Sequence, residues 1–146
     1  MPGDIFVVHG HDELFRAQVV RLLENSTSRN VIVLDEQTSH GRTIIEKFEA
    51  HAGATAYAVV LLTGDDEGRV KGQSELKPRA RQNVILELGY FMGAIGRAKV
   101  AVLHDADVEY PSDIHGVVYI AHKNHWKLDL AKELRDSGIP VDFNKL

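Results

Sequence analysis

One stretch of the chain, residues 57–63, most constrains the fold. It reads Tyr-Ala-Val-Val-Leu-Leu-Thr and is apolar at every position before the final threonine. A strand whose alternating side chains are apolar on both sides must be covered on both faces, as strands of parallel sheets are. The segment therefore predicts a central strand of a sheet that has helices packed on both faces.

Four further apolar segments alternate with segments in which apolar residues recur at helical spacing. The expected strands are residues 4–8, 31–34, 57–63, 99–103 and 117–120. The expected helices are residues 13–24, one that begins near 43, one from 78 to 92, and a terminal one from 126 to about 137. Such alternation with right-handed crossovers predicts an α/β fold. We expect a five-stranded parallel sheet of flavodoxin-like order 2-1-3-4-5, in a single domain spanning residues 1–146.

Composition narrows the classes of function. The 146 residues include no cysteine, which excludes disulfides, zinc–thiolate sites and cysteine nucleophiles. No run reaches the roughly 18 apolar residues of a membrane span, and no secretion signal precedes the first strand. The net charge of −4 argues against a general nucleic-acid binder. We expect a cytoplasmic protein with neither a membrane nor a nucleic acid as its partner.

The segment from Pro78 to Met92 predicts a helix that is buried nearly all round. Proline suits a first helical position, and apolar residues at helical spacing follow it. Glu87 lies in the middle, with no lysine or arginine three or four residues away on either side. Burying a carboxylate costs several kcal/mol, so we take Glu87 as the candidate catalytic residue. The alternative is that Glu87 shares a narrow solvent-facing stripe with Asn83, or pairs with a distant arginine.

Candidate binding residues converge at one edge of the predicted sheet. In such folds ligands bind beyond the carboxyl ends of the strands, where the strand order reverses. The long polar loop of residues 64–78 leads there, and loops of that length are usually lids or binding loops. The residues expected at this edge, besides Glu87 and Asn83, are His9, Gly10, His11, Asp12, Thr63, Gly64, Asp66 and Arg81.

Three motifs at this edge have alternative interpretations. His9 and His11 could be a pair of metal ligands, but a catalytic zinc needs three protein ligands. We therefore expect that this segment forms a turn that contacts the bound substrate, and that it holds no metal. Gly41-Arg42 could hold a phosphate or simply begin a helix, and its spacing does not decide between the two. Asp65-Asp66 could bind Mg²⁺ or remain solvated. The chain has no glycine-rich dinucleotide motif, P-loop or nucleophile elbow.

Five motifs together carry a family resemblance. They are residues 6–12 (FVVHGHD), 41–49 (GRTIIEKFE), 59–66 (VVLLTGDD), 79–91 (RARQNVILELGYF) and 111–116 (PSDIHG). In these segments the chain resembles the TIR-like domain family of bacterial antiphage effectors, in which such domains are fused to a cyclic-nucleotide sensor. The wider TIR family usually has a Trp-Cys pair shortly before its acidic residue, where this chain reads QNVI at residues 82–85.

The resemblance implies an NAD⁺ glycohydrolase with Glu87 as its catalytic residue. NAD⁺ would be the substrate, and no cofactor is expected. Nicotinamide leaves without being protonated, so one carboxylate suffices where most glycosidases use two. Asn83 would steady the carboxylate or a ribose hydroxyl, and Arg42 and Arg81 would meet the diphosphate. The loop of residues 9–12, with Thr63 and Gly64, would line the nicotinamide pocket.

The resemblance also implies partners. The pocket would be completed by self-association with other TIR domains, and the chain would be part of a larger fusion protein with a cyclic-nucleotide sensor domain. Two rival functions remain: a non-catalytic TIR-type interaction module, and an enzyme like the nucleoside deoxyribosyltransferases, which use a glutamate on a related fold.

Overall fold

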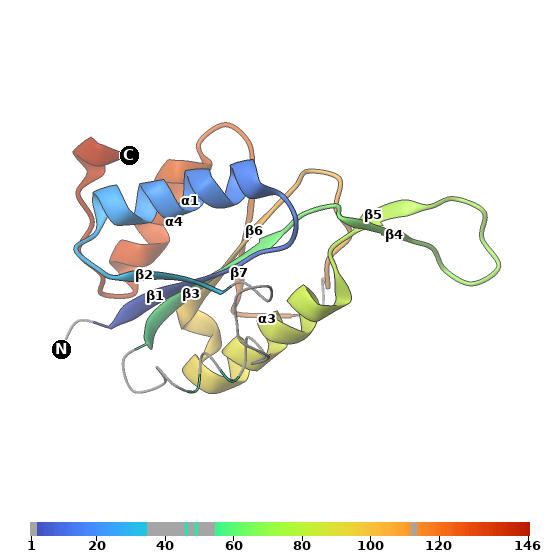
Figure 1. Ribbon diagram of the computed structural model, residues 1–146, viewed down its shortest axis with the longest axis horizontal. Helices are drawn as coiled ribbons and strands as arrows, with labels where there is room; N and C mark the ends of the chain where they lie inside the picture. The colour runs from blue at the N-terminus through green and yellow to red at the C-terminus, as the bar shows by residue number, and fades with distance from the viewer. Residues whose placement is uncertain (1–2, 35–45, 47–48, 50–54, 112–113) are drawn as a thin grey trace.

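A five-stranded parallel sheet forms the centre of the molecule, in the order β2-β1-β3-β6-β7 (Figure 1). The computed structural model describes residues 3–34, 46, 49, 55–111 and 114–146. The strands are β1 (Asp4–Val8), β2 (Val31–Leu34), β3 (Thr55–Leu62), β6 (Val100–His104) and β7 (Val118–Ala121). In chain order these are the five expected strands. The α/β class and the order 2-1-3-4-5 are therefore confirmed, and the strand bounds differ from the expected ones by at most two residues.

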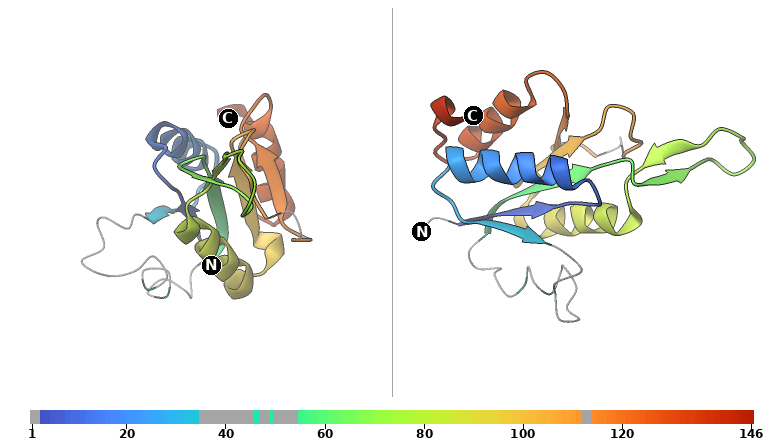
Figure 2. Two further views of the ribbon diagram at one scale, coloured as in Figure 1. Left: turned by 90° about the vertical axis from the view of Figure 1, so that its right-hand side faces the viewer. Right: turned by 45° about the horizontal axis from the view of Figure 1, so that its top comes forward.

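Helices cover both faces of the sheet. They are α1 (Glu13–Ser26), α3 (Gln82–Ile95) and α4 (Trp126–Asp136), with short 3₁₀ turns η3 (Arg97–Lys99) and η4 (Phe143–Lys145). α1 and α4 lie on one face and α3 lies on the other (Figure 2). The expected helix near residue 43 falls outside the described residues, except for Glu46 and Glu49, which are helical.

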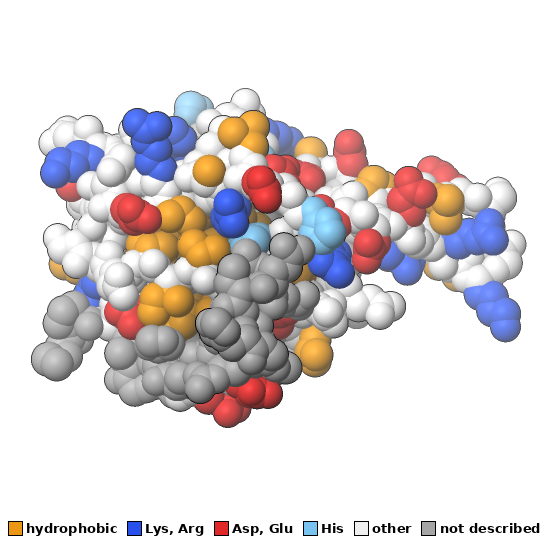
Figure 3. Space-filling view, viewed as in Figure 1, with side chains coloured by type: hydrophobic (Ala, Val, Ile, Leu, Met, Phe, Trp, Pro, Cys, Tyr) orange, Lys and Arg blue, Asp and Glu red, His pale blue; other side chains and the backbone are white. Residues whose placement is uncertain are grey.

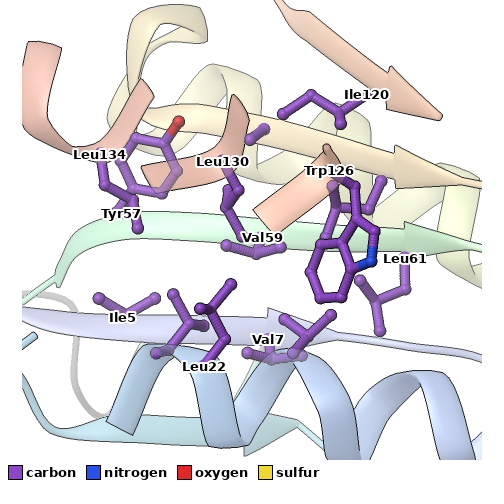
Figure 4. Packing of buried hydrophobic residues seen from close by; sticks show 14 of the residues in the cluster. Ile5, Val7, Leu22, Tyr57, Val59, Leu61, Ile120, Trp126, Leu130 and Leu134 are labelled. Atoms are coloured by element: carbon purple, nitrogen blue, oxygen red, sulfur yellow. The ribbon is translucent and has the colours of Figure 1, made fainter. Parts of the chain in front are cut away.

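The central strands bury side chains on both faces, as the apolar run at residues 57–63 predicts. Successive side chains of a strand point to opposite faces. The cluster under α1 and α4 includes Ile5, Val7, Tyr57, Val59 and Leu61 (Figure 4). The cluster under α3 includes Phe6, Val8, Ala58, Val60 and Leu62. α3 is therefore held against the sheet by a core of its own.

The segment before α3 is a β-hairpin, so two expectations about it are wrong. β4 (Asp66–Gly68) and β5 (Lys77–Arg79) pair antiparallel, with Pro78 opposite Glu67. The loop of residues 64–78 is therefore not without structure, and α3 begins at Gln82 rather than at Pro78. Proline is tolerated in a two-stranded ribbon wherever its missing N–H is not needed. The Pro78 carbonyl still accepts a hydrogen bond from the Glu109 N–H, at 2.8 Å.

α3 buries one side only, which corrects the expectation of a helix buried nearly all round. Val84, Leu88 and Phe91 are buried against the sheet. Leu86, on the opposite side, is 63% exposed. A single helix laid on one face of a sheet keeps an outer surface, even where the residues there are apolar.

Candidate functional site

Glu87 lies on the buried side of α3, in the middle of the helix. Its side chain is only 4% exposed, and it is flanked along the helix by the buried residues Val84, Leu88 and Phe91. The exposed positions of this helix include Asn83, Leu86 and Gly89. The alternative of a solvent-facing stripe is therefore wrong for Glu87. In the folded protein its carboxylate is buried, which costs free energy unless the charge is paired or serves a ligand.

Asp65 ties together two loops at the carboxyl edge of the sheet, and Arg81 joins them through His11. One of its oxygens accepts a hydrogen bond from the Thr63 hydroxyl, and the other accepts one from the His11 N–H; both distances are 2.9 Å. The Arg81 guanidinium reaches His11 Nε2 at 2.6 Å. Arginine can only donate, so Nε2 is the acceptor and the proton of the neutral ring lies on Nδ1. The structure thus brings together His11, Thr63 and Arg81, which follow three different elements.

Gly10 is required where Asp65 crosses over the loop that follows β1. A Cβ atom on Gly10 would overlap Asp65 Oδ2 and would also crowd the Thr63 hydroxyl. The absence of a side chain therefore allows the carboxylate to reach the His11 N–H. This gives Gly10 a structural role, in addition to the turn predicted from the sequence.

Gly10→Ala is expected to lower the free energy of unfolding by about 1–3 kcal/mol, the usual cost of overpacking. Because the cost arises from contact with the Asp65 carboxylate, it should shrink to less than about half in an Asp65→Ala background. Urea unfolding of the two single variants and the double variant measures this coupling. An equal cost in both backgrounds would show that Asp65 is not what excludes a side chain at residue 10.

His9 lies at the end of β1, between the sheet and this loop. Its Nδ1 is 2.7 Å from the Gly10 carbonyl oxygen and so donates to it. Nε2 then carries a lone pair, is buried, and has no hydrogen-bond partner among the residues that the structure describes. This atom is an acceptor available to a hydroxyl or N–H group of a ligand.

Two hollows open at the same edge, and several of the predicted residues line one or the other. The larger, of about 600 Å³, lies between the hairpin, the start of α3 and the segment of residues 109–111; its walls include Asp66, Arg81 and Asn83. The smaller, of about 450 Å³, has Asp12, Thr63 and Gly64 in its wall. Glu87 lines neither of them, and Arg42 falls outside the described residues. The predicted contacts of these residues with a substrate stay predictions.

In the smaller hollow, the polar groups of the predicted residues serve the loops themselves. The Asp12 carboxylate caps α1 by accepting from the Phe15 N–H at 3.0 Å. The Gly64 N–H donates to Asp105 Oδ2 at 3.2 Å. Sequence reasoning missed Asp105, although its position directly after β6 places it at the same sheet edge as the other candidates.

Tyr110, in the wall of the larger hollow, belongs to an aromatic cluster that sequence reasoning also missed. Tyr110 stacks on Tyr119 with ring centroids 4.7 Å apart, and His104 lies 4.5 Å from Tyr110. The Tyr119 hydroxyl donates to the Pro111 carbonyl at 2.9 Å. Burial, and to a smaller extent Tyr110, raises the pKa of Tyr119 above its ordinary value. Arg79 and Glu109 line the same hollow and form an ion pair at 2.9 Å, which fixes the base of the hairpin.

Known proteins resemble this chain over most of its length. Residues 4–124 match the family model of the CAP12/Pycsar effector protein TIR domain. The chain belongs to this family. The resemblance read from the five motifs is thereby confirmed.

Two curated relatives and one solved structure illustrate the similarity. The uncharacterized protein YuaY of Escherichia coli (strain K12) is 46% identical over 143 residues, which cover 97% of this chain and 48% of YuaY. The CD-NTase-associated protein 12 of Sphingobacterium faecium is 36% identical over 90 residues, which cover 62% of this chain and 24% of that protein. The IL-17 receptor B SEFIR domain superposes with a TM-score of 0.49 at 14% identity, over 92% of this chain and 96% of that one. The chain thus spans less than half the length of these two curated relatives.

Within the described ranges, no group of three or more histidine, aspartate or glutamate side chains is placed to hold a metal ion. In the same part of the chain, no helix has both the length and the apolar character that crossing a membrane requires.

Proposed function

We propose that this TIR domain is an NAD⁺ nucleosidase that cleaves the nicotinamide–ribose bond, with Glu87 as its catalytic residue. The observation that carries the proposal is the placement of Glu87: an acidic side chain, 4% exposed, on the sheet-facing side of α3. Family membership supports the proposal, because the TIR-like resemblance implies this activity. The reaction would take place in the cytoplasm, where NAD⁺ is available.

Cleavage of the nicotinamide–ribose bond requires little of the protein beyond one negative charge. The C1′–N bond breaks with its electron pair moving to the nicotinamide nitrogen, which neutralises the charge of the pyridinium ring. Positive charge then develops on the ribose, and an ionised carboxylate held away from water stabilises it more strongly than an exposed one would. Water adds to C1′ and releases one proton, which gives ADP-ribose. An internal nucleophile in place of water would give a cyclic product.

Other residues at this edge are suited to binding the substrate. Asn83 lies one helical turn before Glu87, so its amide can reach a ribose hydroxyl or the carboxylate. Arg81 carries the positive charge closest to the start of α3 and can meet a phosphate. His9 Nε2 offers a buried acceptor to a hydroxyl or amide of the substrate. Arg42, expected to meet the diphosphate, keeps that role in the proposal.

The names of the relatives suggest a biological setting. Pycsar effector proteins from Xanthomonas perforans and Pseudomonas aeruginosa are among the similar proteins, as is CD-NTase-associated protein 12. We therefore place this chain as an antiphage effector that depletes NAD⁺ when a fused or associated cyclic-nucleotide sensor clusters it. The parts of these relatives that the chain does not match leave room for such a sensor.

One assay tests the proposal against both rival functions. Purified protein is incubated with NAD⁺, and in parallel with a deoxynucleoside, over about a hundredfold range of protein concentration and with a clustering agent. We expect release of nicotinamide from NAD⁺ and a turnover number that rises with concentration. A flat turnover number would contradict activation by self-association. No loss of NAD⁺ under clustering would indicate an interaction module, and base exchange on the deoxynucleoside alone would indicate a deoxyribosyltransferase.

A further inference from the structure

The hairpin of residues 66–79, here called the arm, projects beyond the body of the domain (Figure 1). At its outer end Val70 and Leu76 are 60% and 52% exposed. Residues 69–77 carry three basic side chains (Arg69, Lys71 and Lys77) and one acidic side chain, so this end has a net charge of +2 in a chain of −4. Figure 3 shows basic and apolar side chains gathered at the end of the arm. An exposed strand pair with apolar and basic side chains at its end is suited to contact another surface.

The smaller hollow has the opposite charge, and we call it the acidic hollow. Four aspartates line it: Asp12, Asp65, Asp105 and Asp107. No lysine or arginine is in its wall, and none of the ion pairs found within the described residues involves these four carboxylates. Pro78 and Ala106, both exposed, add apolar surface to the same wall. The acidic hollow therefore complements the end of the arm both in charge and in having apolar contacts to offer.

Three of these carboxylates are held in place by other parts of the structure. Asp12 caps α1, Asp65 accepts from Thr63 and His11, and Asp105 accepts from the Gly64 N–H. Concentrated negative charge that is already oriented favours an incoming cation without the cost of ordering side chains. Asp107 is exposed at the rim.

The arm of a given molecule cannot fill its own acidic hollow. Pro78, at the base of the arm, is part of the wall of the hollow, and from there the arm extends away from the body (Figures 1 and 2). The antiparallel pairing from Asp66–Arg79 to Gly68–Lys77 keeps the arm extended in that direction. The complementary surfaces of one chain therefore face different neighbours.

We propose that the end of the arm of one molecule docks in the acidic hollow of a second copy of this chain. Arg69 and Lys71 meet the aspartates, while Val70 packs on Ala106. A contact between two different surfaces of identical molecules is heterologous and does not close on itself in pairs, so repetition produces an open, head-to-tail row. The contact involves Asp65, which holds His11 and Thr63. Docking therefore contacts a residue that holds the candidate site together. Only this connection between docking and the site rests on the proposed function.

Sedimentation velocity of the purified chain without NAD⁺ tests the contact. We expect association that grows with protein concentration at roughly 20 mM salt and weakens at roughly 500 mM, because the charges are exposed. Arg69→Glu with Lys71→Glu should weaken the association at least tenfold. Arg21→Glu with Lys123→Glu changes two exposed basic residues elsewhere by the same net charge and should leave the association unchanged.

A complementation experiment makes the test specific for head-to-tail docking. The arm variant Arg69→Glu/Lys71→Glu keeps an intact acidic hollow, and the hollow variant Asp107→Lys keeps an intact arm. Each alone should be monomeric, whereas their mixture should form a one-to-one complex. The proposal is overturned if the wild-type chain stays monomeric at every concentration, if the arm variant associates as the wild type does, or if the mixture stays monomeric. Glu87→Gln should associate normally, so failure of this contact is distinct from failure of the proposed function.

Discussion

Glu87→Gln is expected to lower the rate of nicotinamide release by at least about a hundredfold, the scale on which loss of one electrostatic stabiliser acts. The substitution keeps the size of the side chain and removes only its negative charge. Since a neutral amide costs less to bury than a carboxylate, the free energy of unfolding should stay equal or rise. Release of nicotinamide measured by chromatography, together with urea unfolding, separates the chemical effect from the structural one.

Val84→Ala provides the matched control on the same helix. Val84 is buried three residues before Glu87, and its truncation should lower the free energy of unfolding by about 2 kcal/mol through lost packing. Turnover per folded molecule should nevertheless remain close to that of the wild type. If Glu87→Gln keeps more than about a tenth of the wild-type turnover, Glu87 is not the catalytic residue.

Phe91→Ala is expected to have the largest effect on stability, lowering the free energy of unfolding by about 3–5 kcal/mol. Phe91 is fully buried between α3 and the sheet, and its ring centroid lies 6.1 Å from that of Phe6 on β1. A domain of this size has a total stability of about 5–15 kcal/mol, so the loss takes a large share of it. Urea unfolding followed by circular dichroism measures the change.

Leu86→Ala tests the orientation of α3 in the same experiment. Leu86 is 63% exposed, so its truncation should change the free energy of unfolding by less than about 0.5 kcal/mol. Similar losses for Phe91→Ala and Leu86→Ala would mean that the helix presents a different side to the sheet, and Glu87 would then no longer point inward.

The sheet could be predicted because its signal is strong and local. Buried strands such as β1, β3 and β6 are continuous apolar runs, and the segments between them are long enough for crossovers. The order then follows from the few topologies that right-handed connections allow. The cap of α1 at Asp12 was likewise predictable, because a capping side chain acts within one turn of its helix.

The arm could not be predicted, because nothing in its sequence is typical of strands. Asp66–Gly68 and Lys77–Arg79 contain no β-branched or aromatic residue, and one of them includes a proline. The hairpin is held instead by its own ladder and by contacts of Pro78 and Arg79 with Glu109, some thirty residues away. From the sequence alone the proline predicts the start of a helix, because only tertiary contacts place it in a ribbon.

The rule for ligand sites in parallel sheets predicts that residues 9–12, 63–64 and 81–87 meet at one edge. The structure brings His11, Thr63 and Arg81 together there, whereas Glu87 lines neither hollow. The bonds of Asp65 depend on how two loops cross: His11 and Asp65 are 54 residues apart in sequence. Asp65-Asp66 was weighed as a cation site or a solvated pair. In the structure Asp65 organises the loops, while Asp66 begins the arm.

The connection between the arm and the helix that carries Glu87 is very short. The arm ends at Arg79 and α3 begins at Gln82, so only Ala80 and Arg81 separate them, and Ala80 is itself buried. Two residues span at most about 7 Å and have no slack to absorb a displacement. A displacement of the outer end of the hairpin is therefore transmitted directly to the first turn of the helix.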